Sequence, residues 1–216
     1  MKVLVTGTTQ GIGKAIAEKF LHNGHKVIGF DIKESSISNP NYSHYVLDIS
    51  TSELPIIDGI NILVNNAGCQ HMDISDIKVN LEGTMRVTEK YAFQENIKSV
   101  LNIASSSGST GAEFPEYAAS KGGVLAYTKN VALRIAKYGA TCNSVSPGGV
   151  KTDINDHIMK DEKLWNAVLN EALLHKWAEP EEIAEWVYFI TVINKSMTGE
   201  DILIDNGEKM NFNFIW

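Results

Sequence analysis

The feature that most constrains the fold is a regular alternation of unbroken apolar runs with segments of helical spacing. The apolar runs cover residues 2–6, 26–31, 44–48, 60–66, 98–105, 141–146 and 201–205. Helical spacing covers residues 11–24, 75–95, 115–138, 154–176 and 180–193. Strands that are apolar on both faces belong in a parallel sheet covered by helices, and right-handed crossovers join them. The alternation therefore predicts an α/β fold with a doubly wound parallel sheet of about seven strands.

Length and composition fit one globular domain spanning residues 1–216. Of the 216 residues, 44% are hydrophobic and 21% are charged, which is ordinary for a folded protein. The formal net charge of -7 gives no sign of the basic patch that nucleic acids or anionic membranes require. No apolar run reaches the roughly 18 residues that span a bilayer. We therefore expect neither a nucleic-acid nor a membrane partner.

Cysteine and histidine usage argues against disulfides and metals. Cys69 and Cys142 lie far apart and form no CxxC motif, so we expect a reduced, cytoplasmic protein. The six histidines are scattered; His22 and His25 are the only close pair, and no carboxylate-rich cluster joins them. We expect no metal site.

A glycine-rich turn joins the first predicted strand to the first predicted helix. The stretch VTGTTQGIGKAIA places Gly7, Gly11 and Gly13 at this turn, in the spacing G-x-x-x-G-x-G. Glycine lets the backbone approach a diphosphate closely, and the helix N-terminus offers N–H groups and a positive dipole end. The turn predicts dinucleotide binding, although a purely structural turn is an alternative.

Asp31 ends the second predicted strand, 18 residues after Gly13. A carboxylate at this position accepts hydrogen bonds from the adenosine ribose hydroxyls and repels a 2′-phosphate. Residue 10 in the glycine turn is glutamine and not a cation, and no arginine follows Asp31, although Lys33 is close. The pattern favours NAD over NADP; a solvated acid at the start of a loop is the alternative.

Tyr117 and Lys121 lie four residues apart in the stretch YAASKGG. Side chains at i and i+4 share one face of a helix. A nearby ammonium favours the phenolate and lowers a tyrosine pKa from its free value of about 10. The pair therefore suits proton transfer, while the small residues around it are also compatible with the packing of two helices.

Taken in order, the motifs of the chain resemble those of the short-chain dehydrogenases/reductases of the classical type. They are TGTTQGIG (6–13), LVNNAG (63–68), VNLEGT (79–84), NIASSSG (102–108), YAASK (117–121), NSVSPGGVKTD (143–153) and TGEDILIDNG (198–207). The resemblance runs nearly end to end. It implies a single Rossmann-type domain that transfers a hydride between a nicotinamide cofactor and an alcohol or ketone.

The resemblance also implies four catalytic residues. Tyr117 would be the general acid/base, and Lys121 would assist it and bind the nicotinamide ribose. Ser105 would hold the substrate oxygen, although two further serines follow it directly and its twelve-residue step to Tyr117 is one shorter than usual. Asn80 would orient a water in the proton relay through its carbonyl, or else serve helix packing.

Cofactor contacts follow from the resemblance by position. Asp48 would face the adenine amino group with Ile49 beside it, and Asn66 would line the adenosine ribose. Residues 147–152 would bind the carboxamide. The implied cofactor-binding set is Gly7, Thr8, Gln10, Gly11, Ile12, Gly13, Asp31, Asp48, Ile49, Asn66, Ala67, Gly68, Tyr117, Lys121, Pro147, Gly148, Val150 and Thr152.

Two segments are shorter than members of the family usually have. Sixteen residues lie between Asp48 and Asn65, too few for the usual full helix, and eleven lie between Gly68 and Asn80. We expect a more open substrate cleft, or one that a neighbouring subunit completes. The resemblance implies a homotetramer, with a homodimer as the alternative.

The substrate stays open beyond a secondary alcohol or ketone. Residues 153–177 hold the position of the family's substrate loop, and their apolar side chains either line a pocket or pack as an ordinary amphipathic helix: Ile158, Trp165, Val168, Leu169 and Leu173. Gln70 and His71 follow the NNAG motif, where they can touch the substrate, although His71 is also typical of a surface position.

Two other functions fit parts of the sequence. An NADP-dependent 3-oxoacyl-thioester reductase needs a cation for the 2′-phosphate and usually a basic docking surface, so Asp31 and the net charge of -7 argue against it. A dinucleotide-sensing protein without catalysis would typically lack the pair formed by Tyr117 and Lys121. We therefore expect an NAD-dependent oxidoreductase.

Overall fold

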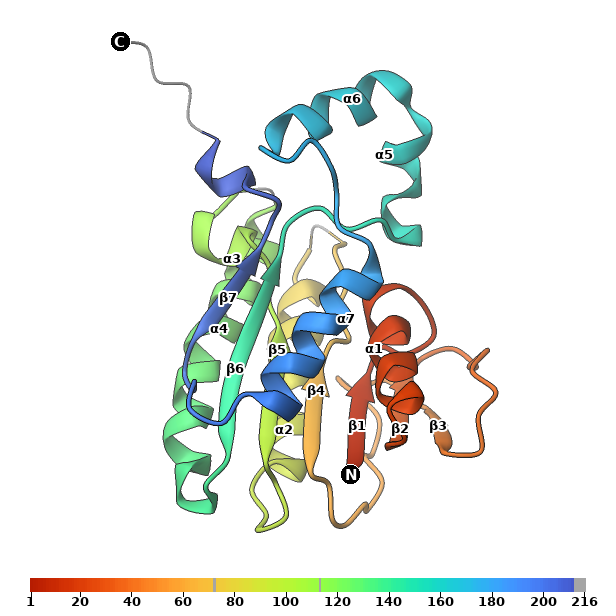
Figure 1. Cartoon of the computed structure of the whole chain (residues 1–216), viewed down its shortest axis with the longest axis vertical. Helices are drawn as coiled ribbons and strands as arrows, with labels where there is room; N and C mark the ends of the chain where they lie inside the picture. Colours follow the sequence, from red (N-terminus) through yellow and green to blue (C-terminus); the bar gives the residue numbers. More distant parts are fainter. Residues whose placement is uncertain (72, 113, 212–216) are drawn as a thin grey trace.

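Seven parallel strands form one sheet in the order β3-β2-β1-β4-β5-β6-β7 (Figure 1). The structure is a computed structural model and describes residues 1–71, 73–112 and 114–211. The predicted doubly wound sheet is confirmed. Its strands are β1 Lys2–Thr6, β2 Lys26–Asp31, β3 Tyr42–Val46, β4 Ile62–Asn65, β5 Ser99–Ile103, β6 Thr141–Pro147 and β7 Asp201–Ile204.

The order of the strands reverses direction at β1. This strand pairs with β2 on one side and with β4 on the other, where Val5 lies opposite Val64. The chain that leaves β1 therefore runs one way across the sheet, and the chain that leaves β4 runs the other way. Such a reversal opens a crevice outside the carboxyl ends of the strands, where ligands of doubly wound folds bind.

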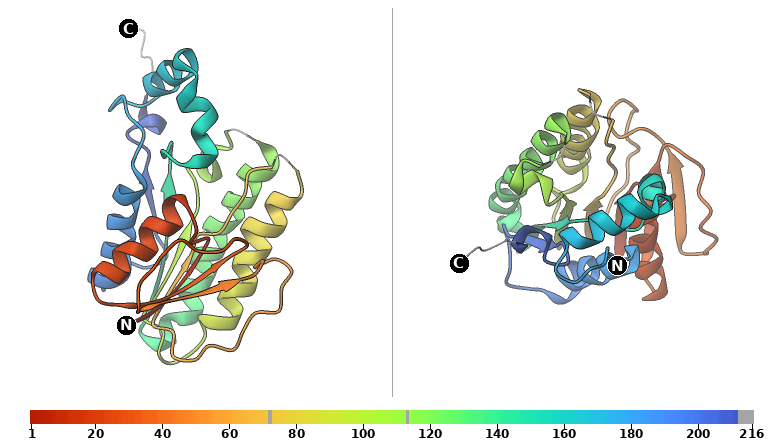
Figure 2. Two further views of the ribbon diagram at one scale, coloured as in Figure 1. Left: turned by 90° about the vertical axis from the view of Figure 1, so that its right-hand side faces the viewer. Right: turned by 90° about the horizontal axis from the view of Figure 1, so that it is seen from above.

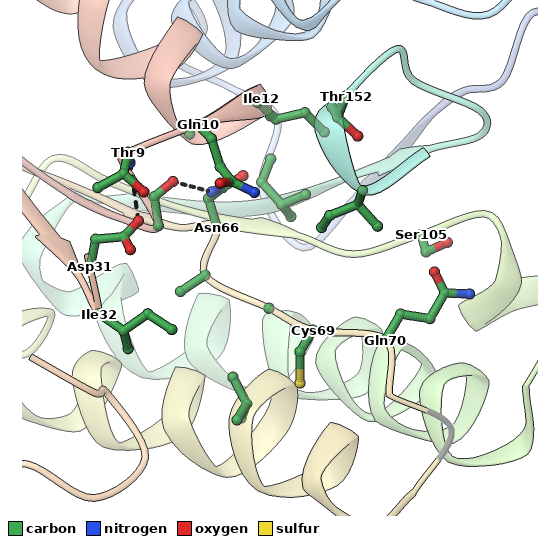
Figure 3. A pocket seen from close by; sticks show the side chains of 18 of the residues that line it. Thr9, Gln10, Ile12, Asp31, Ile32, Asn66, Cys69, Gln70, Ser105 and Thr152 are labelled. Atoms are coloured by element: carbon green, nitrogen blue, oxygen red, sulfur yellow. Dashed lines mark hydrogen bonds between the residues drawn. The ribbon is translucent and has the colours of Figure 1, made fainter. Parts of the chain in front are cut away.

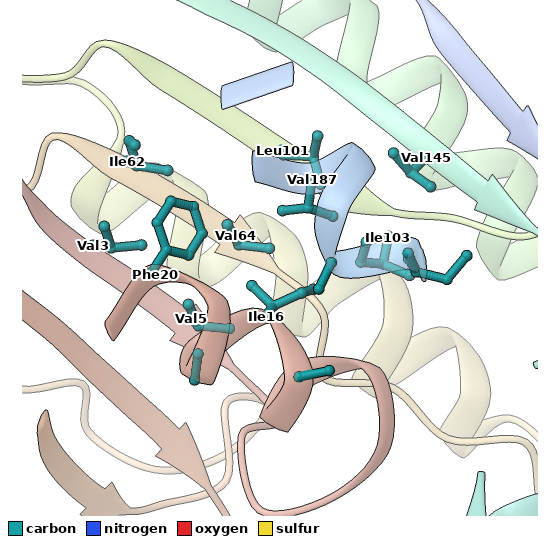
Figure 4. Close-up of a cluster of buried hydrophobic side chains, with 14 of the residues drawn as sticks. Val3, Val5, Ile16, Phe20, Ile62, Val64, Leu101, Ile103, Val145 and Val187 are labelled. Atoms are coloured by element: carbon teal, nitrogen blue, oxygen red, sulfur yellow. The ribbon is translucent and has the colours of Figure 1, made fainter. Parts of the chain in front are cut away.

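Helices cover both faces of the sheet (Figure 2). The helices α1 (Gly11–His22) and α7 (Pro180–Tyr188) pack together on one face, while α2 (Thr84–Tyr91) and α4 (Pro115–Ile135) lie on the other. On the first face, Phe20 and Val187 pack over the fully buried β-branched residues of the central strands (Figure 4). This burial explains why those strands read as unbroken apolar runs.

Shorter helical segments complete the chain, and two of them correct the predicted helix over residues 154–176. Two helices, α5 (Asp156–Lys160) and α6 (Glu162–Glu171), occupy this range. They are separate because the Asp161 carboxylate accepts from the backbone N–H groups of Lys163 and Leu164 and starts a new helix. Among the described residues, no helix is both long and apolar enough to cross a bilayer. The shorter segments are η1 Ile77–Gly83, α3 Ser107–Thr110, η2 Ala136–Tyr138, η3 Asp153–Asn155, α5 Asp156–Lys160, α6 Glu162–Glu171, η4 Phe189–Ile193 and η5 Glu208–Met210.

The connection between β3 and β4 has no helix, as its length predicted. Residues 47–61 are all described, and they run as an irregular segment across the sheet. Backbone carbonyls that are buried away from water need hydrogen-bond donors, and here helix α2 supplies them. Three of its side chains donate to this segment: Arg86 to Ile49 and Ser52, Lys90 to Leu54, and Tyr91 to Pro55.

Candidate functional site

A cavity of about 620 Å³ lies at the carboxyl ends of the strands, where the strand order reverses (Figure 3). The structure places every predicted site residue in its lining except Thr8 and Asn80. Residues widely separated in the sequence thus line one cavity. The predicted residues that line it are Gly7, Gln10, Gly11, Ile12, Gly13, Asp31, Asp48, Ile49, Asn66, Ala67, Gly68, Ser105, Tyr117, Lys121, Pro147, Gly148, Val150 and Thr152.

The glycine turn is packed so closely that it excludes side chains. A Cβ atom on Gly13 would lie 1.9 Å from the carbonyl oxygen of Gly7, and Gly7 itself has a φ of +75°. The Asn66 amide donates to the carbonyls of Thr6 and Gly7 at 3.0 and 3.1 Å. This bond ties the turn to the end of β4. The start of α1 therefore faces the cavity with its free N–H groups, which suits a diphosphate.

Asp31 joins the glycine turn to the end of β2. Its carboxylate accepts from the backbone N–H of Thr9 at 3.0 Å (Figure 3). It also accepts from the backbone N–H of Lys33 at 3.0 Å. The Lys33 ammonium donates to the Gln10 side chain at 3.1 Å. The Thr9 hydroxyl is buried in the cavity wall and has no hydrogen-bond partner among the described residues. A buried hydroxyl that has no partner and lies next to the glycine turn is suited to hydrogen-bond the polar groups of a dinucleotide.

Thr8 lies behind this wall and anchors a hydrogen-bonded chain that sequence reasoning missed. Its hydroxyl is 2.8 Å from that of Tyr42, which is 2.9 Å from His44 Nδ1. His44 Nε2 lies 2.8 Å from the Lys33 carbonyl oxygen, which can only accept. If Nε2 carries the proton and Nδ1 accepts, each hydrogen bond of the chain is donated in the direction from Thr8 to Lys33. A Cβ on Gly29 would lie 2.1 Å from the Tyr42 oxygen, so the glycine inside β2 was the available signal.

Asp48 and Ile49, predicted to face an adenine, both line the cavity. The Asp48 carboxylate accepts from the backbone and the hydroxyl of Ser50 at 2.8 and 2.7 Å. Burial raises the pKa of Asp48, but the bonds from Ser50 outweigh it and hold the pKa below its usual value. The carboxylate therefore stays charged at neutral pH and can accept from an amino group.

Tyr117 and Lys121 project from α4 into the other end of the cavity. The Lys121 ammonium lies 5.7 Å from the centre of the Tyr117 ring and donates to the Ile103 carbonyl at 2.9 Å. Burial lowers the pKa of Lys121 to about 8, against the opposing effect of Cys69 and Asp76. Lys121 is thus still mostly protonated at pH 7, with its charge held close to the tyrosine.

Ser105 follows β5 and faces the same end of the cavity. Its hydroxyl is 3.2 Å from both the hydroxyl and the backbone nitrogen of Ser107. Neither Ser107 nor Ser106 lines the cavity. The Gln70 side chain points toward Ser105 (Figure 3). Of the three adjacent serines, Ser105 is therefore the one that lines the cavity.

Asn80 lies in a π-helical segment, η1, and its side chain does not line the cavity. Its amide exchanges two hydrogen bonds with the backbone of Cys69, at 2.8 and 2.9 Å. It also donates to the Ser120 hydroxyl of α4 at 3.0 Å. The side chain thus holds the shortened loop after β4 against α4, and π-helical turns are frequent at functional sites.

The shortened loop gathers three side chains that sequence reasoning did not connect. Asp76 is fully buried and accepts from the backbone N–H of His71 at 2.8 Å and from the Cys69 thiol at 3.4 Å. Burial and the neighbouring Asp76 raise the pKa of the Cys69 thiol to about 12. The Cys69 thiol is therefore protonated at neutral pH.

The segment over residues 153–177 lies above the carboxyl ends of the strands. Ile154 and Asn155 line the cavity, whereas none of the five apolar residues singled out in this segment does so. Trp165 packs edge-on against Trp177 at 5.1 Å, and Trp177 covers Gly149, where a Cβ would lie 2.1 Å from the indole nitrogen. These contacts favour the packing alternative for the apolar residues.

Comparison with known proteins agrees with this geometry. The family model described as enoyl-(acyl carrier protein) reductase matches residues 7–209. The 3-oxoacyl-(acyl-carrier-protein) reductase FabG of Vibrio cholerae is 31% identical over 240 residues, covering 96% of each chain. A short chain dehydrogenase family protein from Francisella tularensis is 27% identical, with a TM-score of 0.84 over 97% of this chain and 99% of that one. A 4-hydroxyisoleucine dehydrogenase complexed with NADH is 25% identical, with a TM-score of 0.86 over 98% and 99%.

Proposed function

Because the chain belongs to the short-chain dehydrogenase/reductase family and is thus an NAD(P)-dependent oxidoreductase, we propose that it interconverts a secondary alcohol and a ketone with NAD(H). The observation that carries the proposal is the convergence of Ser105, Tyr117 and Lys121 at one end of a cavity whose other end holds Asp31. A dinucleotide laid along this cavity would meet the glycine turn between the two ends.

Each catalytic residue has a separate task in this proposal. When bound, the nicotinamide supplies or accepts the hydride. Tyr117 gives its phenolic proton to the carbonyl oxygen during reduction and takes a proton from the alcohol during oxidation. The Lys121 ammonium favours the phenolate, and the Ser105 hydroxyl orients the substrate oxygen. The role of the Asn80 carbonyl in orienting a water stays a prediction.

The preference for NAD(H) follows from the surroundings of Asp31. A 2′-phosphate would bring negative charge against the carboxylate, whereas ribose hydroxyls would donate to it. The Lys33 ammonium lies nearby but is engaged with Gln10. Calorimetric titration should show NADH binding at least about tenfold tighter than NADPH, a difference of about 1.4 kcal/mol.

Substitutions at the two charges sharpen this test. Asp31→Ala should reduce the difference in affinity between the two cofactors. NADH should bind more weakly, and NADPH should bind more tightly. Lys33→Ala, the matched control, removes the one side-chain cation that, among the described residues, lines the cavity near Asp31. It should therefore widen the difference in affinity between NADH and NADPH. Equal or tighter binding of NADPH by the unaltered protein would refute the preference.

A 3-oxoacyl thioester is the second candidate substrate, because the Vibrio cholerae relative at 31% identity is named for that reaction. It too contains a ketone, so the same residues would serve. Asp31 and the net charge of -7 do not favour NADPH or an acidic carrier protein. Rates of reduced-nicotinamide oxidation with acetoacetyl-coenzyme A and with simple cyclic ketones, each measured with NADH and NADPH, separate the two candidates.

We further propose that the protein is a homo-oligomer, a tetramer or a dimer, built on the outer faces of α2 and α4. Leu133 on α4 is 81% exposed, an unusual position for leucine on a helix, and Met85 on α2 is also exposed. Arg134 and Glu89 pair at 2.6 Å and hold the two helices side by side. Light scattering should give a mass of two or four times 23.8 kDa, and a clean monomer would contradict the proposal.

A further inference from the structure

We propose that Cys69, His71 and Asp76 form a binding site for a thiophilic divalent cation, with Zn²⁺ as the ion that fits. A thiol sulfur, an imidazole nitrogen and a carboxylate oxygen from these residues lie within 4.8 Å of one another. Sulfur, nitrogen and oxygen donors together are the ligand set of zinc, whereas Mg²⁺ and Ca²⁺ take oxygen ligands.

The spacing of two ligand atoms already matches a tetrahedral ion. Cys69 Sγ and Asp76 Oδ1 are 3.4 Å apart. With Zn–S of about 2.3 Å and Zn–O of about 2.0 Å, a tetrahedral angle separates the two ligand atoms by about 3.5 Å. The His71 ring is exposed and rests 3.1 Å from the Ser75 hydroxyl, so rotation can bring a ring nitrogen onto the ion.

Hydrogen bonds hold the backbones of Cys69 and His71 in place. Asp76 is fully buried at the start of η1, and its carboxylate accepts the His71 N–H. Asn80 holds the Cys69 backbone through two hydrogen bonds. Hydrogen bonds that fix the first ligands are a regular feature of metal sites. Binding would displace the Cys69 thiol proton to solvent, leaving a thiolate and a carboxylate against the double charge of the ion.

The site opens onto the cavity that holds Tyr117 and Lys121. Cys69 and His71 both line that cavity, so the fourth position on the ion faces water there. The neighbouring residue Gly68 approaches Lys121 closely, since a Cβ on Gly68 would lie 3.5 Å from the lysine nitrogen. A bound cation therefore stands close to the lysine ammonium, and we expect Zn²⁺ to inhibit turnover.

Competition between the protein and a chromogenic chelator for Zn²⁺ tests the site without cofactor or substrate. The unaltered protein should bind one ion, and Cys69→Ala and His71→Ala should each weaken that binding by at least about tenfold. Cys142→Ala and His157→Ala, which alter a thiol and an imidazole outside the site, should bind as the unaltered protein does. With Co²⁺ in place of Zn²⁺, a sulfur-to-metal charge-transfer band should appear and vanish in Cys69→Ala.

Two results would overturn the proposal. One is the absence of Zn²⁺ binding by the unaltered protein, and the other is equal binding by Cys69→Ala and His71→Ala. These outcomes do not depend on the proposed reaction, because neither uses activity. Turnover that stays unchanged when Zn²⁺ fills the site would overturn the placement of the ion close to Lys121.

Discussion

Replacing Tyr117 with phenylalanine should lower kcat by about 10²–10⁴-fold, the usual contribution of a positioned general acid/base. The substitution removes one hydroxyl and keeps the ring, whose centre lies 5.7 Å from the Lys121 nitrogen. NADH affinity and the fold should therefore change little. Steady-state kinetics, calorimetric titration with NADH and circular dichroism measure the three properties separately.

The same helix offers a matched control in Tyr127. Its hydroxyl donates to Glu89 of α2 at 3.0 Å, and Tyr127 does not line the cavity. Tyr127→Phe removes an equivalent atom, so it should cost about 1 kcal/mol of stability through the lost hydrogen bond and leave kcat unchanged. If Tyr117→Phe keeps more than about a tenth of the activity, the tyrosine is structural and the proton comes from elsewhere.

The sheet could be predicted because its strands are buried on both faces. Every residue of β4 and β5 is buried, so their sequences are apolar except for side chains that pair internally. Asn65 pairs with Asn102 at 2.8 Å, and the Ser99 hydroxyl lies 3.1 Å from that of Thr141. For the edge strand β3, the sequence pattern predicted residues 44–48, whereas the strand covers Tyr42–Val46 and so begins two residues earlier. Its inward residues Tyr42 and His44 are held by hydrogen bonds, which leave no apolar pattern.

The cavity lining could be predicted because each motif ends a strand or begins a helix at the same edge of the sheet. Side-chain contacts between residues far apart in the sequence could not be predicted in this way, because they leave no local sequence pattern. Arg86 and Lys90 read as ordinary cations on a helix, yet they bind the carbonyls of the irregular segment before β4. In the same way, Asp76 reads as a surface acid and is fully buried against the Cys69 loop.

Replacing Lys121 should have opposite effects on the stability and the activity of the protein. Burial lowers the pKa of this lysine from 10.5 to about 8, which means that the fold disfavours the ammonium by about 3 kcal/mol at pH 7. Lys121→Met removes the charge and keeps a long unbranched side chain. We expect the variant to unfold at higher urea concentration than the unaltered protein at pH 7, and to lose turnover and NADH affinity.

The pH dependence of that gain has a definite sign. Between pH 8 and 10.5 the unfolded chain holds a proton on Lys121 that the folded protein releases, so the stability of the unaltered protein rises with pH there. Lys121→Met lacks this rise. The difference in unfolding free energy between the two proteins should therefore be largest at pH 7 and shrink toward pH 10.

Lys129→Met provides the comparison on the same helix, because the Lys129 side chain is exposed. It should shift the urea midpoint little at either pH. If Lys121→Met is instead less stable than the unaltered protein at pH 7, the bond from the ammonium to the Ile103 carbonyl at 2.9 Å outweighs the cost of burying the charge. A gain in stability together with lost turnover would mean that the fold keeps an unfavourable buried cation because proton transfer at Tyr117 requires it.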